Sequence, residues 1–168
     1  MKWVLVTGTW RLADKEVEKD VRKAAQDIIA RGDGVLTGGA TGVDYYAMDE
    51  GLKKDPAAAR LKIIIPAQLE DYIKDVYNNW CVAPVTKNNV DALAELLRKI
   101  KKINPKSITE MAYEVITQEH YNLRNMEEVK VADEVYAFQV NDSTGTQHTI
   151  DQAKLAGIPI TFHKKYKI

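Results

Sequence analysis

Three short segments rich in glycine and hydroxyl residues are the parts of this sequence best suited to chemistry. They are Thr7-Gly8-Thr9, Thr37-Gly38-Gly39-Ala40-Thr41-Gly42-Val43-Asp44 and Ser143-Thr144-Gly145-Thr146. Glycine lets a backbone approach a ligand closely, and the free N–H groups at the start of a following helix carry partial positive charge. Each segment is therefore suited to hold an anion such as a phosphate, while capping of a helix is the alternative role for its Ser, Thr and Gly residues.

The longest of these segments matches neither of the common phosphate-binding fingerprints. Gly38, Gly39 and Gly42 lack the G-x-G-x-x-G spacing of dinucleotide sites, and no Lys-Ser or Lys-Thr pair follows them as in a P-loop. The residues support two interpretations. Either the glycines bring the backbone close to an anion, or Thr41 caps the following helix and Asp44 complements the helix dipole.

Two further polar residues precede a buried strand. Arg124 and Asn125 belong to a helical pattern, and the planar guanidinium of an arginine can hold a phosphate or a carboxylate through two parallel hydrogen bonds. A surface ion pair with Glu127 or Glu128 is the alternative for Arg124.

The elements that must position these residues alternate between strand and helix. Short, β-branched apolar runs predict strands buried on both faces, and apolar residues three and four apart predict helices. Their order is typical of a right-handed, doubly wound parallel unit. We therefore predict a Rossmann-like three-layer α/β sandwich with a mostly parallel sheet of about five strands. The expected strands are Val4–Val6, Val35–Leu36, Leu61–Ile65, Glu134–Phe138 and Ile158–Phe162, and the expected helices between them cover 14–31, 43–52 and 146–156.

The three polar segments follow the first, second and fourth of these strands. Because parallel strands end at the same edge of a sheet, the segments are expected to meet there. We predict a pocket for an anion or a sugar at the carboxyl edge of the sheet.

The stretch Ala67–Gln118 is predicted to be a helical elaboration of this unit. Helical spacing covers Leu69–Tyr77 and Val90–Ile103. Ser107 and Glu110, three residues apart, form a capping box that predicts a third helix.

Composition and charge limit the classes of function. With 168 residues, 45% of them hydrophobic, the chain fits one domain over residues 1–168. Lys plus Arg and Asp plus Glu both number 24, and few aromatic residues cluster, so nucleic acid is not the expected partner. No segment approaches the roughly 18–20 apolar residues of a membrane span, so we expect a cytoplasmic protein without a membrane partner. Cys81 is expected to be buried, and the three histidines lack the spacing of a zinc site.

Three motifs in this order resemble the SLOG superfamily of Rossmann-like domains, which includes DNA processing protein A (DprA), the YpsA family and the Lonely-guy phosphoribohydrolases. "VLVTGTWRL" resembles the opening strand and turn, and "LTGGATGVDYYAM" resembles the second, glycine-rich block. "RNMEEVKVADEVYAF" followed by "STGTQHTIDQAKLAGIPI" resembles the closing half. The resemblance implies one pocket for a nucleotide or nucleotide-derived ligand, lined by Gly8, Thr9, Arg11, Gly38, Gly39, Thr41, Gly42, Asp44, Arg124, Asn125, Ser143, Gly145, Thr146 and Thr149.

Two positions depart from the pattern of that superfamily. Trp10 stands where many members carry the arginine of the first turn, with Arg11 beside it as the available replacement. Thr149 stands at the position of the glutamate with which the phosphoribohydrolases act on the N-glycosidic bond, and threonine lacks the carboxylate that stabilises oxocarbenium-like charge. The chain therefore resembles the non-hydrolytic DprA and YpsA side more closely. Its other candidate carboxylates are Asp44, Asp142, Glu119 and Asp151.

Residues and resemblance together predict binding of a nucleotide or a nucleotide-derived phosphorylated ligand, with no reaction, metal or further cofactor assigned. Hydrolysis of the N-glycosidic bond of a nucleoside monophosphate, by a carboxylate other than the usual one, is the first alternative. Single-stranded DNA binding of the DprA type is the second. Self-association into a homo-oligomer is an expectation by analogy with the superfamily.

Overall fold

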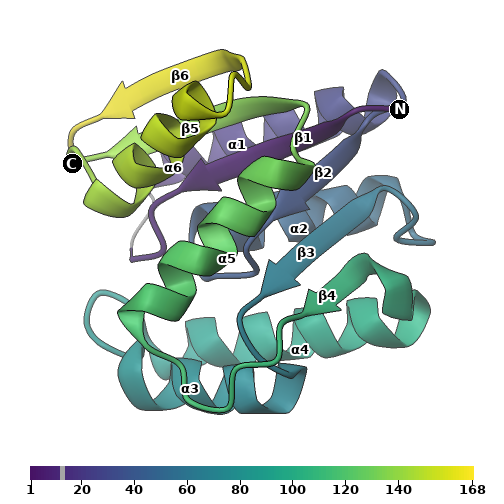
Figure 1. Cartoon of the computed structure of the whole chain (residues 1–168). Helices are drawn as coiled ribbons and strands as arrows, with labels where there is room; N and C mark the ends of the chain where they lie inside the picture. The colour runs from purple at the N-terminus through teal and green to yellow at the C-terminus, as the bar shows by residue number, and fades with distance from the viewer. Residues whose placement is uncertain (12–13) are drawn as a thin grey trace.

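Helices cover both faces of one parallel sheet, which makes a three-layer α/β architecture (Figure 1). A computed structural model describes residues 1–11 and 14–168. The strands are β1 (Trp3–Gly8), β2 (Gly34–Thr37), β3 (Leu61–Ile65), β4 (Ile108–Glu110), β5 (Glu134–Val140) and β6 (Ile160–Tyr166). The helices are α1 (Lys15–Ala30), α2 (Val43–Lys54), α3 (Leu69–Asn79), α4 (Lys87–Ile103), the short 3-10 helix η1 (Pro105–Ser107), α5 (Gln118–Val131) and α6 (Thr144–Leu155).

The strand order reverses beside β1. The six strands lie in the order β4-β3-β2-β1-β5-β6, and all neighbouring pairs are parallel. The carboxyl ends of β1 and β5 therefore mark the topological switch point, where open parallel sheets place their ligands. The pairing of β1 with β5 runs from Val4 opposite Glu134 to Gly8 opposite Phe138, so the turns that follow these strands lie next to each other.

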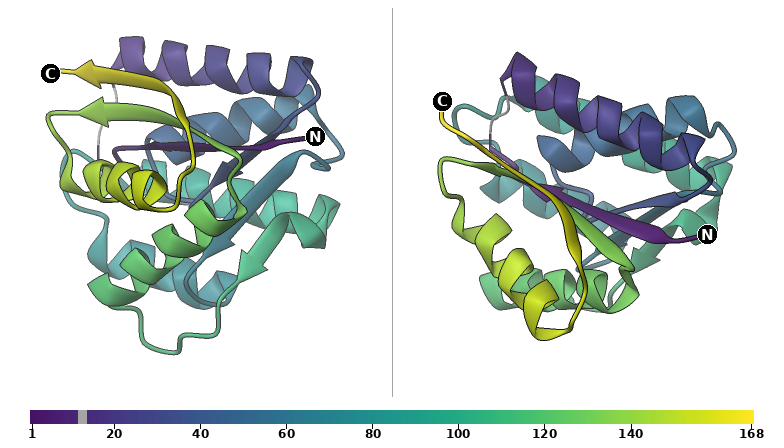
Figure 2. Two further views of the ribbon diagram at one scale, coloured as in Figure 1. Left: turned by 45° about the horizontal axis from the view of Figure 1, so that its top comes forward. Right: turned by 90° about the horizontal axis from the view of Figure 1, so that it is seen from above.

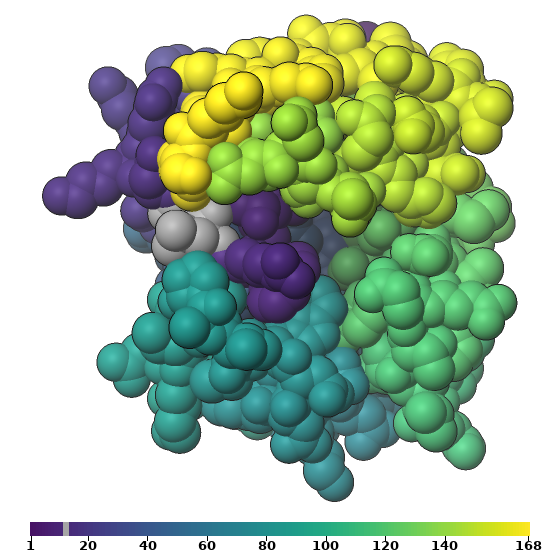
Figure 3. All heavy atoms as spheres, turned by 90° about the vertical axis from the view of Figure 1, so that its left-hand side faces the viewer, coloured from purple at the N-terminus to yellow at the C-terminus, as the bar shows by residue number. Residues whose placement is uncertain are grey.

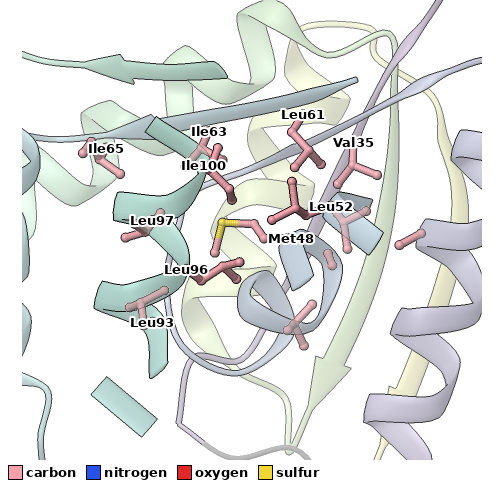
Figure 4. Packing of buried hydrophobic residues seen from close by; sticks show 14 of the residues in the cluster. Val35, Met48, Leu52, Leu61, Ile63, Ile65, Leu93, Leu96, Leu97 and Ile100 are labelled. Carbon is pink, nitrogen blue, oxygen red and sulfur yellow. The ribbon is translucent and has the colours of Figure 1, made fainter. Parts of the chain in front are cut away.

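Alternate residues of the strands contribute to two separate cores. Val4 and Val6 of β1 belong to the larger core, together with buried residues of α1, α2 and α4, whereas Leu5 belongs to the smaller core beneath α5 and α6. The two views of Figure 2 show these two helical layers on opposite faces of the sheet. Figure 4 shows part of the larger core, where Met48 of α2 and Leu97 of α4 lie close to the sheet. Apolar burial on both faces holds the strand ends, and the turns attached to them, in place.

The predicted Rossmann-like fold is confirmed, with six strands in the described part of the chain in place of the five expected. The helix predicted to start at Ser107 is wrong, because this stretch forms the edge strand β4 beside β3. The Ser107 hydroxyl donates to the Ala58 carbonyl at 2.6 Å, and the Glu110 carboxylate accepts from the amide of Leu69, the first residue of α3, at 3.0 Å. Neither side chain therefore caps a helix that starts at Ser107. The next helix, α5, is capped by Thr117, ten residues further along the chain.

Within residues 1–11 and 14–168, no helix is both long and apolar enough to cross a bilayer. Leu12, the last residue of the first motif of the SLOG resemblance, lies outside the described residues.

Candidate functional site

A cleft opens at the carboxyl edge of the sheet, next to the ends of β1 and β5. Its volume is about 990 Å³, and most of its wall comes from residues 6–11, 75–84, 116–128 and 140–149. Figure 3 shows it as a hollow between the β5–α6 turn (yellow-green) and the segment at the end of α3 (teal), with residues of the first turn (purple) between them. The cleft therefore occupies the place at which the switch point predicts a ligand.

Most of the predicted ligand-binding residues meet in this cleft. Its lining includes Gly8, Thr9, Arg11, Asp44, Arg124, Asn125, Ser143, Gly145, Thr146 and Thr149. Gly38, Gly39, Thr41 and Gly42 are not among the lining residues; they belong to the turn that carries Ala40 and Asp44, which do line it. Ligand contact by any of these residues stays a prediction.

The polar groups of the glycine turn are largely used within the protein. The Gly39 amide donates to the Thr37 hydroxyl at 3.0 Å, and the Ala40 amide donates to the Asp44 carboxylate at 3.1 Å. The Thr41 hydroxyl donates to the Trp10 carbonyl at 2.6 Å, and Gly42, not Thr41, is the N-cap of α2. The interpretation in which Thr41 caps the helix is therefore wrong, because its hydroxyl joins this turn to the first turn instead.

Two glycines of this turn are required by close approach. Gly42 has a φ of 72°, which side chains rarely tolerate, and a Cβ there would overlap with the Thr9 carbonyl. Both the backbone conformation and the lack of space therefore exclude a side chain. A Cβ on Gly38 would overlap with the guanidinium of Arg124. These glycines thus let the turns after β1 and β2, and helix α5, pack against one another behind the cleft.

A buried ion cluster lies at this junction. Arg124 is 6% exposed, and its Nε lies 3.3 Å from Oε1 of Glu128, which is 4% exposed. The same Nε donates to the Asn125 side chain at 3.0 Å, and Nη1 donates to the Gly38 carbonyl. The contact of Arg124 with Glu128, expected as an alternative, is therefore present, although it is buried and not on the surface.

One guanidinium in this cluster faces two buried carboxyl groups. Burial raises the pKa of Glu128 to about 8, Arg124 opposes the shift, and the negative charge of Asp44 adds to it. Burial also raises the pKa of Asp44, against the opposing effect of Arg124 and of the Ala40 amide. The cluster is neutral when one of the two carboxyl groups keeps its proton, and we assign that proton to Glu128, whose Oε1 has no hydrogen-bond donor within the described residues.

The start of helix α6 forms another wall of the cleft. The Ser143 side chain makes no capping hydrogen bond to the helix, and the first amide bonded back to the Ser143 carbonyl is that of Gln147, at 3.0 Å. The amides of Thr144, Gly145 and Thr146 have no acceptor within residues 1–11 and 14–168. Together with the neighbouring hydroxyl groups, these amides provide hydrogen-bond donors for an anion.

An aromatic wall that was not predicted completes the cleft. The ring centroids of Trp10 and Trp80 lie 4.5 Å apart, and those of Trp80 and Tyr121 lie 4.8 Å apart. The expectation that few aromatic residues cluster is therefore wrong, because these rings come from three distant parts of the chain. Cys81, which follows Trp80, is exposed and not buried as predicted, because the segment after α3 lies at the surface. The only sign of the aromatic wall in the sequence was Trp10, which stands where many SLOG members carry an arginine.

The candidate carboxylates separate into two groups. Asp44 and Asp142 line the cleft, whereas Glu119 and Asp151 do not. Glu128, which sequence reasoning considered only as an ion-pair partner, also lines it. Among the described residues, no group of three or more His, Cys, Asp or Glu side chains could hold a metal ion.

The sequence matches no protein-family model, and comparison with curated proteins finds no match. Solved structures of similar fold do exist. One is DNA processing protein A from Helicobacter pylori, whose structure was solved to explain how it binds single-stranded DNA. It superposes with a TM-score of 0.66 at 18% sequence identity, over 95% of this chain and 63% of the Helicobacter chain. A molybdenum cofactor binding protein from Rippkaea orientalis superposes with a TM-score of 0.59 at 20% identity, over 95% of this chain and 74% of that one.

DNA processing protein A (DprA) from Streptococcus pneumoniae is a third neighbour, with a TM-score of 0.61 at 18% identity over 99% of this chain. The chain spans only 63% of the length of the Helicobacter protein and 50% of the Streptococcus protein. These structures share the Rossmann-like fold that the SLOG resemblance implied.

Proposed function

We propose that the protein binds a nucleotide or a nucleotide-derived phosphorylated ligand in the cleft at the carboxyl edge of β1 and β5. The observation that carries the proposal is the start of α6, where three amides without acceptors in the described chain lie beside the hydroxyls of Ser143, Thr146 and Thr149. A helix N-terminus of this kind stabilises negative charge, so we place the phosphate there.

The position and size of the cleft support this proposal. Open parallel sheets bind ligands at the switch point, and a cleft of about 990 Å³ is at the upper end of the range of small-molecule sites, which is about 300–1,000 Å³. The names of two structural neighbours also describe binding, of single-stranded DNA in one and of a molybdenum cofactor in the other.

The charges of the cleft argue against a nucleic-acid strand. Its lining contains two guanidinium groups, those of Arg11 and Arg124, and four carboxyl groups, those of Asp44, Asp75, Glu128 and Asp142. A strand adds a phosphate with every nucleotide and depends on a surplus of basic residues. Single-stranded DNA is the alternative that the aromatic wall supports. A mobility shift with an oligonucleotide tests it, and we expect none at physiological salt.

Thermal unfolding tests the proposal in its general form. A ligand that binds only the folded state adds about 2.7 kcal/mol at 100 times its Kd, which raises the Tm of a protein of this size by about 5–10 °C. We expect such a shift with at least one nucleoside monophosphate. A panel of mono-, di- and cyclic nucleotides without any shift at millimolar concentration would contradict the proposal.

Hydrolysis of an N-glycosidic bond is the second candidate function, and Glu128 is the observation that favours it. A carboxyl group that keeps its proton near neutral pH can donate it to the leaving base as the C1′–N bond breaks. The carboxylate that results then takes up the proton released by the water that adds to C1′. The expected result is release of free base from a nucleoside monophosphate, lost in Glu128→Gln and retained in Glu119→Gln, which lies outside the cleft lining. Absence of base release from the common monophosphates would exclude this candidate.

A further inference from the structure

The aromatic wall of the cleft consists of Trp10, Trp80 and Tyr121, and the proposed phosphate site does not use it. Figure 3 shows the segment that carries Trp80 (teal) across the hollow from the β5–α6 turn. A ligand that extends from the start of α6 across the cleft therefore meets these rings.

We propose that this wall stacks a flat heteroaromatic ring of the ligand, and that the ring carries an exocyclic amino group. The inference rests on the proposed function and deepens it, because it assigns the chemistry of the other end of the ligand. Rings of this class occur in adenine, guanine, cytosine and the pterins.

Stacking is supported by how the rings are packed. Successive rings are tilted by 47° and 49°, and Trp10 and Trp80 are only half-buried, so part of each indole remains open towards the cleft. The guanidinium of Arg11 lies 5.1 Å from the Trp10 ring centroid, which adds a second planar group to the same wall. Each base stacked on an aromatic side chain contributes enough free energy to change affinity by about tenfold or more.

The polar neighbours of the wall indicate the edge of the ring. Tyr121 donates its hydroxyl proton to Asp75 Oδ2 at 2.5 Å, and Asn79 donates from Nδ2 to Asp75 Oδ1 at 2.8 Å. These bonds leave the Asn79 carbonyl oxygen and the remaining lone pairs of Asp75 as acceptors in the lining. An amino group can donate hydrogen bonds to these acceptors, whereas a ring carbonyl at the same place is itself an acceptor and is repelled by them.

Intrinsic tryptophan fluorescence tests the inference directly. Trp3 is the only tryptophan outside the cleft lining, so Trp3→Phe provides a background in which both remaining indoles report on the cleft. The probes are AMP against IMP, CMP against UMP, neopterin, and ribose 5-phosphate. We expect quenching by AMP and CMP with affinities at least several-fold above those of IMP and UMP, and weaker binding of ribose 5-phosphate.

Substitution of Trp80 separates stacking from a purely structural role. Trp80→Leu is expected to weaken AMP binding about tenfold or more, whereas Trp80→Phe restores most of the affinity because it keeps an aromatic face. Circular dichroism confirms that both variants are folded, and binding is compared only between folded proteins.

Each outcome has a defined meaning. Tighter binding of neopterin than of AMP identifies a pterin as the source of the ring and supports the inference. Equal affinities within the AMP–IMP and CMP–UMP pairs overturn the assignment of the amino group. Binding of ribose 5-phosphate as tightly as AMP, unaffected by Trp80→Leu, overturns stacking but leaves the proposed function intact. Absence of binding by every probe overturns both.

Discussion

Replacing Arg124 by methionine is expected to lower the free energy of unfolding by about 3–5 kcal/mol at pH 8. Arg124 is buried beside Glu128 and Asp44, and its Nη1 donates to the Gly38 carbonyl. Methionine fills similar space without charge, so two buried carboxyl groups lose their cation and one buried carbonyl loses its donor. An unpaired buried charge costs far more than a surface ion pair contributes.

Urea unfolding at two pH values measures this effect. At pH 5.5 the loss in Arg124→Met is expected to be smaller, because Glu128, whose pKa is about 8, then keeps its proton and needs no cation. The double variant Arg124→Met/Glu128→Gln is expected to lose less than the sum of the single variants, since the amide is neutral. Equal losses at both pH values, or additive losses in the double variant, would show that the charges do not interact.

The second large effect is a pH dependence carried by Glu128. Its pKa is about 8 in the folded protein and near 4.5 when the chain is unfolded, because burial disfavours the carboxylate. Between these values the folded state binds more protons than the unfolded state. The stabilisation is therefore complete below about pH 4.5 and is lost as the pH rises to about 8, by at most about 1.4 kcal/mol per pH unit.

Other carboxyl groups act in a different pH range. The pKa of Asp20 is lowered by its hydrogen bond from Lys164, and that of Asp49 is lowered by Lys53 and Arg22 despite burial, so their stabilisation is lost only as the pH falls below about 4. Chemical unfolding of the wild type and of Glu128→Gln, which cannot titrate at this position, is compared between pH 5.5 and 8.5. The difference between the two curves isolates the effect of Glu128. We expect a shallower decline in the variant, and parallel curves for the two proteins would be evidence against the raised pKa.

The fold could be predicted in large part because its strands are buried on both faces. The run Val4–Val6 is entirely apolar, and Leu61–Ile65 is apolar except for Lys62, so both indicate strands of a parallel sheet. The order of strands and helices then places the polar turns at one edge. The edge strand β4 could not be predicted, because the spacing of Ser107 and Glu110 also matches a capping box. In the structure both side chains make long-range hydrogen bonds instead, to Ala58 and to Leu69.

The site could be predicted only where a local pattern carries the signal. Arg124 and Glu128 are four residues apart on one helix, so their pairing was a visible alternative, but their burial depends on Gly38, which lies far away in the sequence. The aromatic wall depends even more on tertiary structure, because Trp10, Trp80 and Tyr121 belong to three separate segments. Contacts of this kind have no sequence spacing to reveal them.

The start of α6 offers a matched pair of variants for the central claim. Gly145 is exposed, and a Cβ there would meet nothing within 4 Å, so larger side chains fit without rearrangement. A carboxylate in the first turn of a helix interacts favourably with the helix dipole, so Gly145→Glu should fold as stably as Gly145→Gln. The two variants have the same size and differ by one negative charge, which lies where we place the phosphate.

Titration calorimetry of these two variants with AMP and with adenosine is the most direct test of phosphate binding at the start of α6. We predict that Gly145→Glu binds AMP at least about tenfold more weakly than Gly145→Gln through repulsion of the phosphate. Adenosine, which lacks the phosphate, should bind both variants equally. Binding of AMP to Gly145→Glu as tightly as to Gly145→Gln would contradict the account.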